Sequence, residues 1–167
     1  MNLAHIHLLI NHIPLIGLPV AITFFGYGLW TKNSPMQRLS LFIITCLAII
    51  VLPVFFTGEP ADELVEHLPG VGESFIESHE GAAKFSLALT LLAGLFSIAA
   101  LWFHKKSFRR QLNIGVLIIS IIAVLSLAYT ANLGGKIRHT EVRANTSIDS
   151  GSKAGTGVEK DDDDDLD

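Results

Sequence analysis

The most prominent feature of the sequence is a set of four long apolar runs separated by short polar segments. The runs cover Ile13–Trp30, Leu39–Thr57, Ala82–Phe103 and Leu112–Leu133. Each reaches, or nearly reaches, the roughly 20 residues that an α-helix needs to cross about 30 Å of bilayer hydrocarbon. Runs of this length joined by short connections predict an all-α integral membrane protein, folded as an up-and-down four-helix bundle.

The overall composition also indicates a membrane protein. The chain has 167 residues, of which 50% are hydrophobic and only 17% are charged, and its mean hydropathy is +0.48. These values are too apolar for an ordinary soluble domain of this size. No Lys or Arg precedes the first run and no small-residue cleavage site follows it. We therefore expect the first helix to be retained and not removed as a signal peptide.

The charged residues of the connections predict the orientation of the bundle. Two short connections, Trp30–Arg38 and His104–Arg110, contain Lys and Arg but no Asp or Glu. Short loops rich in Lys and Arg stay in the cytoplasm. The third connection, Gly58–Ser78, contains six acidic residues and neither Lys nor Arg. We therefore expect a multi-pass protein of the bacterial inner membrane, with both termini and the acidic connection outside, in the periplasmic or other extracytoplasmic compartment.

The segments outside the four runs are predicted to differ from one another. A short amphipathic helix is expected at about residues 60–68, within the acidic outer connection. The glycine pair Gly134-Gly135 predicts the end of the fourth helix, because glycine readily adopts the left-handed conformation of a helix stop. Residues 1–143 should thus form the bundle. Residues 144–167, which include a run of aspartates, have almost nothing to bury and predict a disordered acidic tail.

Histidines gather on one face of the predicted bundle. Six of the seven reach the outer face in this topology: His5, His7, His12, His67, His79 and His139. Taken singly, an imidazole at the membrane interface needs no functional explanation, since an amphipathic ring is stable there. Three of them, His12, His79 and His139, lie at the outer ends of three different predicted spans. This clustering favours a shared site at the outer face.

The phase of the first helix groups its polar residues into two stripes. At about 100° per residue, His5 and His12 are seven positions apart and fall on nearly the same face. His7 and Asn11 are four positions apart and share a different face. Two polar stripes are therefore expected to enter the membrane side by side.

Imidazole and carboxylate side chains together are the ligands of zinc, copper, iron or nickel, and two imidazoles from facing helices suit haem iron. The candidate cofactor ligands are His7, His12, His79 and His139; for a metal ion the candidates are His12, His79, His139, Glu77 and Glu80; an alternative pair in the outer connection is Glu63 and His67. Three outcomes remain open at this stage: haem b, a transition metal ion, or no bound cofactor.

Several short motifs resemble a known protein family. They are His7-Leu-Leu-Ile-Asn-His12-Ile-Pro14, Thr57-Gly58, His79, and Leu133-Gly134-Gly135 with the following His139. Together they resemble a bacterial family of four-span inner-membrane proteins with a His-Pro-x-x-x-His-Phe-Pro-like first helix and a glycine pair followed by a histidine. The resemblance covers about residues 5–143, with Leu8 in place of the usual proline. It implies the four-span fold and the orientation, and association with cytochromes and redox proteins.

Two functional hypotheses follow from these observations. The first is an inner-membrane accessory protein whose outer His/Glu cluster binds haem or a transition metal in electron transfer or metal handling. The alternative is a non-catalytic structural or assembly subunit of a larger membrane complex, without a cofactor. The sequence contains no Gly-x-Ser-x-Gly, phosphate-binding glycine loop or cysteine beside a histidine, which disfavours an enzyme. We expect the lipid bilayer and other membrane or outer-compartment redox subunits as partners, and no nucleic acid.

Overall fold

The computed structural model describes residues 3–66 and 71–138, and every regular element within them is an α-helix. The helices are α1 (Leu3–Ile10), α2 (His12–Trp30), α3 (Ser34–Phe56), α4 (Glu59–Glu66), α5 (Glu73–Trp102) and α6 (Arg109–Arg138). The segment predicted as a helix at 60–68 is covered by α4 up to Glu66. His67, His139 and the predicted tail at 144–167 lie outside the described residues.

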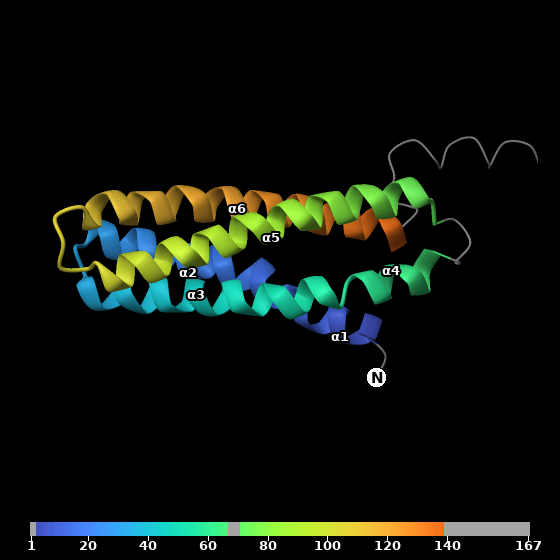
Figure 1. The fold of residues 1–167 in the computed structure, drawn as a ribbon, viewed down its shortest axis with the longest axis horizontal. Coiled ribbons are helices and arrows are strands. Elements are labelled where there is room, and N and C mark those ends of the chain that lie inside the picture. The colour runs from blue at the N-terminus through green and yellow to red at the C-terminus, as the bar shows by residue number, and fades with distance from the viewer. Residues whose placement is uncertain (1–2, 67–70, 139–167) are drawn as a thin grey trace, which may run out of the picture.

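The long helices form an antiparallel bundle (Figure 1). Helix α3 packs against α2 and α5, and α6 packs against α5 and α2, so the four close into a ring. Four helical stretches are long and apolar enough to cross a membrane: Leu3–Trp30, Ser34–Ala61, Glu73–Trp102 and Arg109–Ile137. The prediction of an all-α fold with four potential membrane spans is confirmed, and these helices indicate a multi-pass membrane protein.

The interior of the bundle combines small and hydroxyl-bearing side chains with a few large apolar ones such as Phe25 and Ile44, while many other large apolar side chains cover its outside. Thr90 and Ser97 are fully buried, as is Ala93 between them, whereas Phe42 and Leu125 are largely exposed. This distribution is typical of helices packed in lipid, where small residues allow backbones to approach and apolar side chains face the acyl chains. It explains why neighbouring helices pack closely although the surface of the bundle is apolar.

The first span is interrupted between α1 and α2, at Asn11. Pro14 lies in the first turn of α2 and has no backbone N–H, so it cannot bond to the carbonyl of Ile10. The chain continues through the break in near-helical conformation, because the Asn11 N–H donates to the His7 carbonyl at 3.0 Å and Asn11 has helical dihedral angles. The break lets α1 tilt away from the axis of α2 and contact α4 (Figure 1).

The prediction that the fourth helix ends at Gly134-Gly135 is wrong. Helix α6 continues through both glycines to Arg138. The physical reason lies in packing: a Cβ atom added at Gly134 would stand 3.0 Å from the imidazole Cε1 of His79. The glycine permits close approach of a side chain, and no left-handed residue is required.

A second glycine, Gly94, sets the distance between α3 and α5. A Cβ atom added at Gly94 would collide with the Cβ of Ala48. Both residues are buried, so the two helices have no room to absorb an additional methyl group without moving apart.

We expect the variant Gly94→Ala to destabilise the bundle, because overpacking a close helix contact typically costs about 1–3 kcal/mol. Gly26→Ala is the matched control, since an added Cβ at Gly26 meets no atom within 4 Å and alanine is the better helix former by about 1 kcal/mol. Thermal unfolding in detergent, followed by circular dichroism, should give a lower Tm for the first variant and an unchanged or higher one for the second. Equal Tm values for both variants would contradict the close α3–α5 contact.

Candidate functional site

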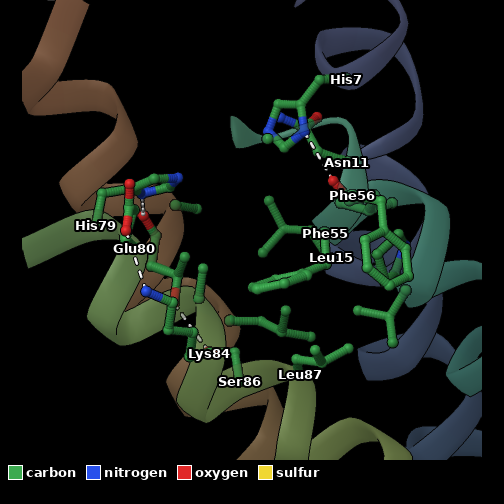
Figure 2. A pocket seen from close by; sticks show the side chains of 18 of the residues that line it. His7, Asn11, Leu15, Phe55, Phe56, His79, Glu80, Lys84, Ser86 and Leu87 are labelled. Carbon is green, nitrogen blue, oxygen red and sulfur yellow. Dashed lines mark hydrogen bonds and ion pairs between the residues drawn. The ribbon is translucent and has the colours of Figure 1, made fainter. Parts of the chain in front are cut away.

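A cavity of about 310 Å³ opens at the end of the bundle that carries α1 and α4. Its deeper part is apolar and includes Leu15, Val51 and Leu87, while its polar lining residues include His7, Asn11, His79, Glu80 and Lys84. Figure 2 shows His7 and His79 on opposite sides of the cavity, each with its ring turned toward it. His7 comes from α1 and His79 from α5, so the two imidazoles approach from different helices.

The His7 ring is fixed by the end of α3. Its Nδ1 lies 2.9 Å from the carbonyl oxygen of Val54 and 3.3 Å from Thr57 Oγ1. A carbonyl oxygen only accepts hydrogen bonds, so Nδ1 must donate and carry the proton. In the neutral ring Nε2 then keeps its lone pair. The ring also packs against Gly58, where an added Cβ would lie 3.4 Å from His7 Cε1.

The His79 ring is held in the same way by α6. Its Nδ1 donates to the carbonyl oxygen of Thr130 at 3.0 Å, and its ring lies against Gly134. The tautomer is again fixed, with the proton on Nδ1 and a lone pair on Nε2. An outer hydrogen bond of this kind is the usual support of a ligating histidine, because it sets the tautomer and the orientation of the ring.

Two other histidines use Nδ1 to donate a hydrogen bond to a carbonyl of their own segment and not to one of a neighbouring helix. His12 donates to the carbonyl of Leu8 and His104 to that of Leu101, both at 3.0 Å and both within a few residues of their own position. Neither ring lines the cavity, and His12 is exposed. The structure thus brings together His7 and His79 of the predicted ligands. Of the other two predicted cofactor ligands, His12 lies outside the lining and His139 outside the described residues.

Asn11 brings an unpartnered amide oxygen into the wall of the cavity. Its side-chain Oδ1 is buried and has no hydrogen-bond partner, and the residue lines the cavity beside His7. A buried polar atom without a partner costs about 1–3 kcal/mol, and such atoms are rare in folded proteins. The side chain would have to turn for this oxygen to reach a group inside the cavity. The i, i+4 spacing from His7 was the sequence signal for this residue.

A cluster of hydroxyl groups ties α5 to α6 below His79, and sequence analysis did not single it out. Ser86 Oγ lies 2.6 Å from Ser126 Oγ and 2.9 Å from Thr130 Oγ1. Ser86 and Thr130 also line the cavity. The cluster fixes Thr130, whose carbonyl holds His79. The only signal in the sequence was the i, i+4 spacing of two hydroxyl residues within an apolar span.

The carboxylates do not complete a metal site within the described part of the chain. Glu80 lines the cavity and pairs with Lys84 at 3.1 Å, and both side chains are substantially exposed, so the pair is a weak one. Glu77 and Glu63 are exposed and do not line the cavity. Across residues 3–66 and 71–138, no group of three or more His, Cys, Asp or Glu side chains could hold a metal ion.

Comparison with protein-family models, with curated proteins and with solved structures finds no match for this chain. The family resemblance described above therefore stays a prediction, and the geometry of the cavity is the main guide to function.

We expect Gly134→Ala to displace the His79 ring, because the new Cβ would lie 3.0 Å from Cε1, closer than ordinary van der Waals contact. Gly135→Ala is the matched control, since a Cβ there meets no atom within 4 Å. Long-range ¹H–¹⁵N NMR of the imidazole groups in micelles should show altered His79 signals in the first variant only. Unchanged His79 signals in Gly134→Ala would mean that the ring is not packed on this glycine.

Proposed function

We propose that this chain is a membrane protein that binds haem b between His7 and His79 and takes part in electron transfer. The observation that carries the proposal is the pair of imidazoles on opposite sides of one cavity, each with Nδ1 bonded to a carbonyl of a neighbouring helix. This arrangement leaves both Nε2 lone pairs available, as ligation of iron requires.

The number of donors favours haem over a bare metal ion. A structural or catalytic metal ion takes three or four protein ligands, and the described residues offer no such group. A haem iron already has four nitrogens from its macrocycle and needs only two axial ligands from the protein. Two imidazoles from facing helices satisfy that need, so the donor set fits haem. Lys84 also lines the cavity and pairs there with Glu80 at 3.1 Å, so it would have to leave Glu80 to bind a carboxylate of the macrocycle.

The environment of the two imidazoles favours electron transfer over catalysis. Haem iron with two protein ligands supplies one-electron chemistry and has no open coordination position for a substrate. The apolar lining residues Leu15, Val51 and Leu87 would shield one side of a bound group from water. This chain's own residues would therefore bind, orient and shield the group.

The proposed orientation places the cavity on the extracytoplasmic side of the bacterial inner membrane, with both termini on the same side. It is supported by the Lys and Arg residues of the two connections at the opposite end of the bundle and by the tendency of such loops to stay in the cytoplasm. A redox subunit of the outer compartment or of the membrane would then exchange electrons at this face.

The haem proposal is tested by absorbance of protein purified from cells supplied with haem precursor. We expect a Soret band in the wild type and at least about a tenfold loss of bound haem in His7→Ala and in His79→Ala, since even outer-shell changes typically cost about 10–100-fold in affinity. His12→Ala is the matched control, because His12 lies on the same N-terminal segment but outside the cavity lining, and it should retain haem.

Two outcomes would overturn the assignment. Loss of haem in His12→Ala together with its retention in His7→Ala would place the ligand on the other face of the first span. A wild type that carries neither haem nor metal after gentle extraction, and variants that still assemble with partners, would favour a structural subunit without a cofactor.

The proposed orientation is tested with a pair of cysteine variants at opposite ends of the bundle, Ser74→Cys and Ser107→Cys. Both positions are exposed. An impermeant thiol reagent added to intact cells should label the cysteine at position 74 and not the one at 107, because only the former would face outward. Permeabilised cells, in which both should react, provide the control. Labelling at 107 alone in intact cells would mean the reverse orientation.

A further inference from the structure

A second cavity, of about 450 Å³, lies at the opposite end of the bundle, where the α2–α3 connection meets the start of α6. Three cationic residues line it: Lys32, Arg109 and Arg110. We propose that this cavity binds the headgroup of an anionic phospholipid that also carries hydroxyl groups, as phosphatidylglycerol does. The proposal is independent of the haem site and of which end of the bundle faces the cytoplasm.

The three cations of this cavity have no acidic residue near them in the sequence. Neither Trp30–Arg38 nor His104–Arg110 contains Asp or Glu, and the acidic residues of the described chain fall between Glu59 and Glu80, at the other end of the bundle (Figure 1). An uncompensated cluster of cations between membrane helices is the usual recognition element for anionic lipid headgroups.

A buried hydrogen-bond chain holds Arg109 in place. Its Nη2 donates to Gln37 Oε1 at 2.6 Å, and Gln37 Nε2 donates to the Gly28 carbonyl at 2.7 Å. Gln37 is only 6% exposed. The guanidinium is therefore positioned by the protein in advance of any ligand. A planar, oriented guanidinium is well suited to bind phosphate oxygens through two parallel hydrogen bonds.

Asn113 indicates that the ligand carries a donor as well as an anion. Its side chain lines the cavity, is only 5% exposed, and has a buried Oδ1 without a partner. An ionised phosphate diester has no proton to donate to this oxygen. A rotation of the Asn113 side chain that turns Oδ1 toward the cavity would let a headgroup hydroxyl donate to it, so the combination of cations and an unpartnered acceptor favours such a headgroup over a phosphate diester without hydroxyl groups.

Exposed aromatic residues at this end favour a lipid over free phosphate as the source of the ligand. Trp30 and Trp102 are 81% and 80% exposed, and Phe103 and Phe108 are also exposed. All four lie next to the two connections at this end of the bundle. Aromatic rings are enriched where a membrane protein crosses the headgroup level, so the cavity lies at the depth of lipid phosphates.

Native mass spectrometry of the purified full chain tests the proposal, with phosphatidylglycerol, phosphatidylethanol, phosphatidylcholine or inorganic phosphate added. Phosphatidylglycerol should bind best and phosphatidylcholine least. Arg110→Gln should weaken phosphatidylglycerol binding about fivefold, the effect expected for one cation near a membrane surface. Lys106→Gln removes the same charge from an exposed loop position outside the cavity and should leave binding unchanged.

Asn113→Ala tests the hydroxyl contact separately. It should weaken binding of phosphatidylglycerol and leave unchanged the binding of phosphatidylethanol, an anionic diester without headgroup hydroxyls, and its Tm in detergent without added lipid checks that the variant folds. Equal binding of phosphatidylglycerol and phosphatidylcholine, or equal effects of Arg110→Gln and Lys106→Gln, would overturn the site. If inorganic phosphate displaces phosphatidylglycerol at equal concentration, the assignment of a lipid ligand would be overturned and the cavity would be a site for free phosphate.

Discussion

Buried polar groups in a membrane-spanning bundle must find their hydrogen-bond partners inside the protein, because lipid offers none. Two buried hydroxyl groups meet this constraint within their own helix, since Thr90 and Ser97 each donate to a carbonyl four residues earlier. Three buried side-chain atoms of the described chain have no partner, those of Asn11, Asn113 and Ser120. Two of the three line the two cavities, one at each end of the bundle. The buried polar atoms that the described chain leaves unpartnered thus include one in the wall of each cavity for which a ligand is proposed.

The close approach of the helices depends on small residues, and the His79 ring of the candidate haem site likewise packs against a glycine. Burial of apolar surface does little to drive helix association in lipid, so packing depends on short distances between backbones. Gly94 provides such a distance between α3 and α5, and Gly134 provides the space in which the His79 ring lies against α6. The ring can then reach the Thr130 carbonyl. The placement of glycines at close contacts thus determines both the packing of α3 against α5 and the orientation of the His79 ring.

The fold could be predicted from the sequence to a large extent, whereas the inward face of the first span could not. The lengths of the apolar runs alone predicted four helices, because the thickness of the bilayer hydrocarbon sets the length of a membrane-spanning helix. Helical phase also grouped the polar residues correctly: His5 and His12 are both exposed, and His7 and Asn11 both line the cavity. In a soluble helix the apolar stripe would have shown which group faces inward. Here both the lipid-facing and the interior faces are apolar, so this signal is absent. Nothing in the sequence therefore favoured His7 over His12, and only the structure shows that His7 lines the cavity.

A purely structural role for His7 explains the hydrogen bond made by its Nδ1 but not the need for a lone pair on Nε2. Val54 lies in the last turn of α3, where helix carbonyls have no partner within the helix, and the His7 Nδ1–H bond satisfies one of them. An uncharged amide or hydroxyl side chain could donate to that carbonyl equally well. The imidazole additionally supplies an Nε2 lone pair beside a cavity whose wall includes Asn11. His79 repeats this arrangement from the opposite side with a different helix, so two unused acceptors of the same kind belong to one cavity. Capping accounts for neither the repetition nor the shared cavity, whereas ligation of one group, as proposed above, would account for both.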